Sequence, residues 1–158
     1  MITIIEDSRQ QEGKHELKRA YFMQKNIEVV RSKLPFGDYA LPPSVAIDTK
    51  ANMDEIAGNI GGSSKEHQRF KRECIAARDA GCHLIFLIEN ECGIRCVDDV
   101  HLWNNPRSIY SDRCITGERL EKAMKTMSAR YGCEFQFCLP EEAGSRIMEL
   151  LGVAYERS

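Results

Sequence analysis

The run His83-Leu84-Ile85-Phe86-Leu87-Ile88 is the feature that most constrains the fold of this chain. It is a continuous apolar segment of strand length, and Gly81 comes just before it. Strands with one face in water alternate apolar and polar residues, whereas an unbroken apolar strand is typical of the interior of an α/β sheet. The run therefore predicts a buried strand inside such a sheet.

Segments with helical and strand periodicity alternate along most of the chain. The patterns predict strands over 2–5, 27–30, 36–41, 45–48, 83–88 and 134–139, and helices over 10–25, 52–60, 65–80, 116–131 and 140–151. In the first helix, Leu17, Ala20 and Tyr21 have the spacing of an apolar face. The segment 91–112 is longer than most loops, so we expect it to be functional or to contain short elements. The alternation predicts an α/β fold with a central mixed β-sheet flanked by helices.

Length and composition indicate one ordinary globular domain over residues 1–158. The charged fraction is 29% and the formal net charge is −2, which argues against a protein that coats nucleic acid without specificity. Local contact with nucleic acid depends instead on where the charges lie. No apolar run has transmembrane length, and Met1–Ile5 is followed at once by two acids, so we expect neither a membrane span nor a signal peptide.

The seven cysteines are scattered and odd in number, which predicts reduced thiols in a cytoplasmic protein. Four of them lie in helical or strand patterns and are interpreted as small core residues: Cys74, Cys82, Cys133 and Cys138. Cys92 and Cys96, with His101 or Cys114, are the one group suited to zinc. Their spacing is not that of a standard zinc knuckle.

Two short motifs suggest a catalytic site. Gly37-Asp38-Tyr39 is followed, ten residues after its aspartate, by Asp48-Thr49-Lys50 in the next predicted strand. Two carboxylates are hard ligands suited to Mg²⁺ or Mn²⁺, and a lysine beside them can orient water or stabilise charge on a phosphate. The alternative is a surface turn followed by an ordinary pair at a strand end.

Further residues are predicted to join this site. Asp7 ends the first predicted strand, and Asp54, one turn into the next helix, is a candidate outer ligand or partner of Lys50. Arg9 is placed to steer a phosphate. In the helix over 65–80, Lys65, Arg69 and Arg72 share one face and predict phosphate contacts. The alternative for that face is a solvated stripe balanced by Glu66 and Glu73.

These motifs resemble the nuclease domain of the XPF-type structure-specific endonucleases, within the PD-(D/E)XK superfamily. That family has a strand ending Asp-x-Arg-Glu, then Gly-Asp-Tyr, then Glu-Arg-Lys with an aspartate four residues after the lysine. The corresponding segments here are Asp7-Ser8-Arg9-Gln10, Gly37-Asp38-Tyr39, and Asp48-Thr49-Lys50 with Asp54. The apolar strand ending in Glu89 also matches, so the likeness spans nearly the whole chain. It implies a restriction-endonuclease-like α/β fold.

The resemblance also implies an activity. Asp38, Asp48 and the Thr49 carbonyl would bind Mg²⁺ or Mn²⁺, supported by Asp7 and Asp54, and Lys50 would assist hydrolysis of DNA. The expected substrates are branched, flap or junction DNA in repair or recombination, cut to leave a 5′-phosphate and a 3′-hydroxyl. The family tends to dimerise, and the candidate surfaces for a homodimer are the apolar sides of the last two helices: Met124, Met127, Ile147 and Leu151. Packing in the core is the favoured alternative for most of these residues.

The sequence departs from the family pattern at three positions. Gln10 stands in place of an acid, Asp48 in place of a glutamate and Thr49 in place of an arginine. The tandem helix-hairpin-helix domain of the relatives is absent from this sequence, and the compact form predicts a bacterial or phage-encoded protein.

Two other functions remain open. The first is a non-catalytic module that binds DNA or a partner on a nuclease fold. The second is a nucleotide-binding α/β enzyme, which is less favoured because no glycine-rich phosphate loop follows the first strand. A need for both a divalent metal and DNA in catalysis would separate these alternatives from a nuclease.

Overall fold

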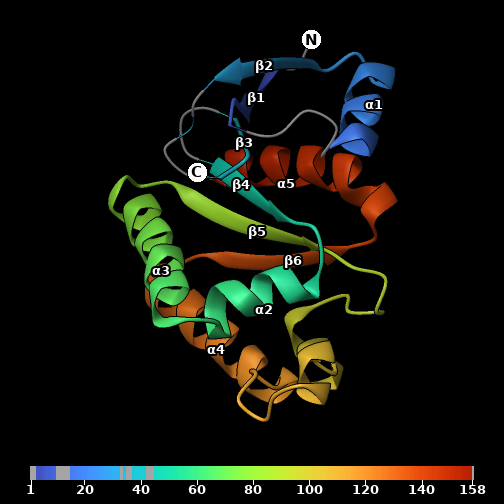
Figure 1. Cartoon of the computed structure of the whole chain (residues 1–158). Helices are drawn as coiled ribbons and strands as arrows, with labels where there is room; N and C mark the ends of the chain where they lie inside the picture. Colours follow the sequence, from blue (N-terminus) through green and yellow to red (C-terminus); the bar gives the residue numbers. More distant parts are fainter. Residues whose placement is uncertain (1–2, 10–14, 33, 35–36, 42–44, 158) are drawn as a thin grey trace.

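The computed structural model describes residues 3–9, 15–32, 34, 37–41 and 45–157. These residues form one mixed sheet of six strands with helices on both faces (Figure 1), which confirms the predicted α/β fold. The strands are β1 (Thr3–Asp7), β2 (Glu28–Ser32), β3 (Tyr39–Leu41), β4 (Val45–Lys50), β5 (His83–Glu89) and β6 (Glu134–Cys138). The helices are α1 (Glu16–Gln24), α2 (Met53–Gly61), α3 (Ser64–Asp79), α4 (Gly117–Tyr131) and α5 (Ala143–Arg157). Short 3-10 helices are η1 (Val97–Leu102), η2 (Pro106–Ile109) and η3 (Pro140–Glu142).

The strand order is β2-β1-β3-β4-β5-β6. The short strand β3 is antiparallel to both of its neighbours, β1 and β4, while the outer pairs are parallel. Each parallel partner is reached through a helical crossover, as parallel strands require. The consequence for function is that the end of β1, the start of β3 and the end of β4 lie in one region of the sheet.

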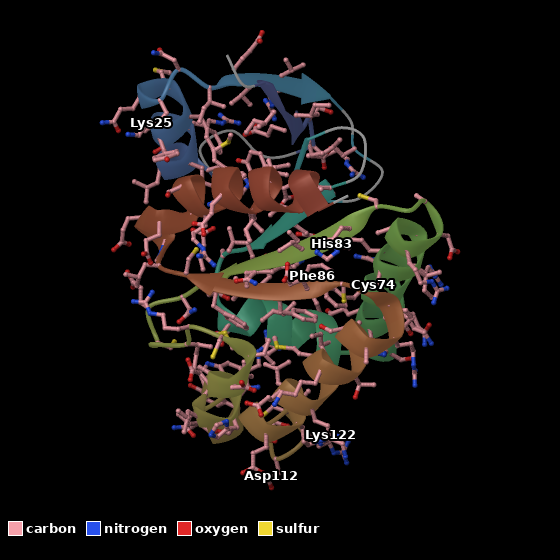
Figure 2. All side chains as sticks on the ribbon, turned by 180° about the vertical axis from the view of Figure 1, so that it is seen from behind. Lys25, Cys74, His83, Phe86, Asp112 and Lys122 are labelled. Carbon is pink, nitrogen blue, oxygen red and sulfur yellow. The ribbon has the colours of Figure 1, made fainter. Side chains whose placement is uncertain are left out.

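Strand β5 is the buried strand that its apolar run predicts. Leu84, Phe86 and Ile88 belong to the core beneath α2, α3 and α4, whereas Ile85 and Leu87 belong to the core beneath α1 and α5. The strand is apolar throughout because both faces are covered. Figure 2 shows Phe86 in the sheet and Cys74 on the neighbouring helix α3.

Helix α1 uses a different inner face from the one its apolar residues predict. Leu17 and Ala20 are exposed, and the residues that α1 buries are Lys18 and Phe22. The reason is electrostatic, because Lys18 Nζ lies 2.6 Å from a carboxylate oxygen of the buried Glu89. A buried carboxylate requires a partner, so the lysine rather than Leu17 turns inward.

Glu6 is held on the other side of β1 from Asp7, since successive strand residues face opposite ways. It is completely buried, and its oxygens lie 3.0 Å from Arg19 Nη2 and 3.2 Å from Arg31 Nε. The Tyr39 hydroxyl donates a third contact at 3.0 Å. This network fastens α1, β1, β2 and β3 together and leaves Asp7 as the acid that faces the site.

The segment 91–112 contains two short elements, η1 and η2. The sequence predicted that this segment is either functional or contains short elements, and the second expectation is confirmed. Trp103 and Asn105 are buried, and the Asn105 amide donates to the Ile115 carbonyl at 2.9 Å. These two residues therefore hold a folded connection in place. Arg107 remains exposed beside them.

The apolar residues suggested for a homodimer are core residues. Met124, Ile147 and Leu151 have no exposed surface, and Met127 is 6% exposed. Their periodicity reflects burial against the sheet, so they offer no surface to a second copy. The last helix also extends past Gly152, where the sequence predicted its end. Within the described residues, no helix combines the length and apolar character needed to span a membrane.

Candidate active site

The ends of three strands bring the predicted motifs together. The Asp7 N–H donates to the Asp38 carbonyl at 2.6 Å, and the Asp38 N–H donates to the Ile47 carbonyl at 2.6 Å. These bonds extend the ladder one residue beyond Tyr39 and fix the backbone of Asp38 between β1 and β4. Asp7, Asp38 and Asp48 therefore line one cleft.

Gly37 makes this approach possible. Its φ is +76°, and a Cβ atom there would lie 3.1 Å from both the Ala46 side chain and the Ile47 carbonyl oxygen. Only glycine adopts this conformation without strain. The Gly37 N–H also donates to Glu73 on α3 at 3.1 Å, so the turn ties α3 to the sheet.

Thr49 holds the Asp38 carboxylate. Its backbone N–H and its hydroxyl both donate to Asp38 Oδ2, each at 2.7 Å. Burial, together with the charge of Asp48, raises the pKa of Asp38 to about 7 against the opposing Thr49 hydrogen bonds. The sequence predicted a role for the Thr49 carbonyl, whereas the contacts seen here come from its hydroxyl and N–H.

Asp48 lies between a cation and a second carboxyl group. It is 8% exposed, and Lys50 Nζ lies 3.4 Å from its Oδ1. Burial raises the pKa of Asp48 well above its usual value; Lys50 opposes this rise, and a hydrogen bond and repulsion from Glu73 add to it. Two carboxyl groups in hydrogen-bond contact share a proton unless a cation compensates their charge.

Lys50 is positioned by aromatic rings. Its Nζ lies 5.8 Å from the centre of the Phe70 ring and 6.0 Å from that of Phe86, a geometry that favours a cation over the ring faces. Burial lowers the pKa of Lys50, but the nearby carboxylates, Asp48 first, outweigh burial and leave it raised. Lys50 is therefore a fixed positive charge beside Asp48.

Asp7 and Arg9 form one unit at the edge of the site. Arg9 Nε lies 3.0 Å and 3.2 Å from the two oxygens of the nearly buried Asp7, and Arg9 Nη2 donates to the Leu34 carbonyl at 2.6 Å. The Leu34 N–H donates back to Asp7 at 3.2 Å. Asp7 therefore orients Arg9 at the same time as it faces the other acids.

The site opens into a cleft of about 420 Å³ between the sheet and α3. Its lining comprises Asp7, Arg9, Gly37, Asp38, Asp48, Arg69, Arg72, Glu73 and Ala76. Arg69 and Arg72 thus line the same cleft as the acids, while the phosphate contacts predicted for them stay a prediction. Lys65 is exposed one turn earlier on α3 and does not line the cleft.

Glu73 lines the cleft, although the sequence suggested only that it balances charge on a solvated face, in the alternative for that side of the helix. Its position could be found from helical spacing, since Arg69, Arg72, Glu73 and Ala76 recur at i, i+3, i+4 and i+7. What the sequence did not reveal is that this face of α3 lies opposite Asp38 and Asp48. Asp54, by contrast, is exposed and lines a separate small hollow with Asn105 and Arg107. Glu55 takes the place expected of Asp54, because its charge acts on Lys50.

The oxygen ligands fit a magnesium-type ion better than zinc. Across the described residues, no three histidine, cysteine, aspartate or glutamate side chains cluster closely enough to enclose a metal ion. This gives no support to zinc at Cys92 and Cys96. Mg²⁺, however, commonly keeps several waters and uses one or two carboxylates. The paired acids of the cleft, with their raised pKa values, match that donor set.

Comparison with known proteins gives two findings. Residues 6–151 match the sequence model of the ERCC4 domain. The structure is similar to XPF from Aeropyrum pernix, with a TM-score of 0.67 at 17% identity, covering 98% of this chain and 66% of that one. The same Aeropyrum pernix protein in complex with DNA gives a TM-score of 0.67 at 16% identity, covering 99% of this chain and 66% of that one. This chain thus spans about two thirds of those structures. No curated protein sequence matches it.

Proposed function

Because this chain belongs to the ERCC4 domain family and has the fold of an XPF-type nuclease domain, we propose that it is a DNA endonuclease that hydrolyses phosphodiester bonds in a metal-dependent reaction. The observation that supports this most directly is that Asp38 and Asp48 line one cleft and that Lys50 lies beside Asp48. A lysine 3.4 Å from a carboxylate, beside a second carboxylate, combines metal ligands with a charge for the phosphate.

The proposed metal ligands are Asp38 and Asp48, with Asp7 and the Thr49 carbonyl in support. A bound Mg²⁺ or Mn²⁺ would supply Lewis-acid activation of the phosphate and of the attacking water. Thr49 holds Asp38 in one orientation by two hydrogen bonds, so this carboxylate is preorganised. Glu73, through its contact with Asp48, has a position suited to orient that side chain.

Lys50 and the arginines of the cleft have separate tasks in this proposal. Lys50 orients water or stabilises the negative charge that develops on the phosphate in the transition state. Arg9, which is paired with Asp7, and Arg69 and Arg72 on α3 line the cleft and attract the DNA backbone. Arginine at the rim offsets the repulsion between a phosphate and the carboxylates. Branched, flap or junction DNA is the proposed substrate class, as for structure-specific relatives.

The test is cleavage of labelled linear, flap and four-way-junction DNA with Mg²⁺ or Mn²⁺, comparing the wild type with Asp48→Asn. We expect the variant to lose at least about a hundredfold in rate, as for groups that act on the transition state. Circular dichroism checks that it remains folded, and Asp112→Asn, at an exposed loop carboxylate, is the control. Retained cleavage in Asp48→Asn would contradict the assignment. Binding without cleavage by the wild type would favour the non-catalytic module.

A further inference from the structure

A second hollow, of about 390 Å³, lies between α3 and α4, which pack side by side on the same face of the sheet (Figure 1). We call it the α3–α4 groove; α3 contributes His67 and Lys71 to it. On a helix of 3.6 residues per turn, these two positions lie about 180° around the axis from the α3 residues of the cleft. The cleft and the groove therefore occupy opposite flanks of one helix.

The groove is rimmed by cations. Lys71 from α3 and Arg119, Lys122 and Arg130 from α4 all line it, and within the described part of the chain no acidic side chain does. Figure 2 shows Lys122 extending from α4 at the edge of the molecule. Four positive charges around one hollow stand out in a chain whose net charge is −2. The local field is therefore opposite in sign to the overall charge.

Among the described residues, these four cations have no carboxylate partner. A neighbouring lysine, by contrast, is paired. Lys125 on the same helix α4 lies 2.9 Å from Asp98 and 3.3 Å from Glu121. Surface cations that stabilise the fold are commonly paired in this way. The groove cations instead leave their charge available to an anion from outside.

The floor of the groove is apolar, formed by Ala123, Met127 and Tyr131, with the latter two nearly buried. A low-dielectric wall beneath a cationic rim concentrates the electrostatic field on the opening. Such a surface favours a polyanion with spaced charges that touches the rim at several points. A nucleic-acid backbone has this character.

We propose that the α3–α4 groove binds phosphates of the same DNA molecule whose scissile bond lies in the cleft, as a second DNA subsite. This inference rests on the proposed function. The cleft side of α3 carries Arg69 and Arg72, so the two sites form one cationic track across the helix. A helix is about 10–12 Å wide, and a DNA strand advances about 3.4 Å per nucleotide, so the groove lies about three nucleotides from the cut.

The experiment compares two double variants that each remove two exposed positive charges. Lys122→Gln/Arg130→Gln removes two charges from the groove. The matched control is Lys25→Gln/Lys125→Gln. Lys125 lies on α4 but does not line the groove, and Lys25 lies at the far end of the molecule (Figure 2). Binding of a fluorescein-labelled DNA duplex is followed by anisotropy in EDTA at several salt concentrations. We expect the groove variant to weaken binding about tenfold and to reduce the salt slope by about 1.8, with little change in the control.

Equal behaviour of the two variants would overturn the groove proposal. A wild-type dimer that the groove variant converts to monomer in sedimentation, without loss of DNA binding, would also overturn it and identify the groove as a protein interface. The outcome for the proposed function is read separately, from cleavage by the wild type in Mg²⁺. If the wild type does not cleave but the groove variant still loses affinity, the nuclease proposal fails, and with it the link to a scissile bond in the cleft, while DNA binding by the groove is retained.

Discussion

Thr49 donates two hydrogen bonds to a single oxygen of Asp38, from its hydroxyl and from its backbone N–H, each 2.7 Å long. The side chain that replaces the family's arginine therefore orients a carboxylate of the site. Thr49→Val keeps the shape and the N–H but removes the hydroxyl donor. We expect about a tenfold loss in cleavage rate from misplacement of Asp38, with a stability cost of about 1 kcal/mol. Thr49→Ser, which keeps the donor, should retain activity; equal loss in both variants would contradict this role.

The raised pKa of Asp38 predicts how the metal-free protein responds to pH. Its pKa is about 7 in the fold against 3.8 for the free side chain, so the folded state binds more protons than the unfolded state between these values. Stability should therefore fall as pH rises from about 4 to 7. Asp38→Asn removes this penalty, which is at most about 4 kcal/mol.

The measurement for this prediction is urea denaturation in EDTA at pH 5 and pH 8. We expect Asp38→Asn to be more stable than the wild type at pH 8, with a smaller difference at pH 5. Asp112→Asn, at an exposed carboxylate, is the control. A gain that is the same at both pH values would show that the ionisation of Asp38 is not its cause.

The sequence predicted the sheet, and it named most of the residues that line the cleft, where chemistry and local pattern agree. The catalytic roles of those residues stay predictions. The apolar run of β5 requires that both faces of the strand are covered. Gly37, Asp38 and Asp48 are spaced so that the pairing of β3 with β4 brings them side by side. Prediction failed where a partner distant in the sequence determines which way a side chain points. Lys18 turns inward because Glu89 is buried, and Glu73 faces the cleft because α3 crosses above Gly37. Neither partner is adjacent in the chain, so periodicity alone carries no signal for the pairing.

The buried pair of Lys18 and Glu89 makes a strong prediction about stability. The two charges lie 2.6 Å apart, with side chains only 5% and 10% exposed. Glu89→Gln leaves the ammonium group of Lys18 buried without its countercharge, so we expect a loss of about 3–5 kcal/mol in the free energy of unfolding. Lys18→Met/Glu89→Leu should recover most of it. Asp98→Asn, which breaks an exposed pair with Lys125, should cost less than about 1 kcal/mol.

The cysteines should differ widely in reactivity towards iodoacetamide. Cys92 and Cys96 are exposed, whereas burial raises the pKa of Cys82 to about 11 and that of Cys138 to about 12. Since the thiolate is the reactive form, a raised pKa slows alkylation at pH 8. We expect peptide mass spectrometry to find Cys92 and Cys96 modified first, and the buried Cys74 and Cys138 last or only after unfolding. The same order with and without EDTA would agree with the absence of a zinc cluster among the described residues. Protection of Cys92 and Cys96 that a chelator abolishes would instead restore the zinc alternative.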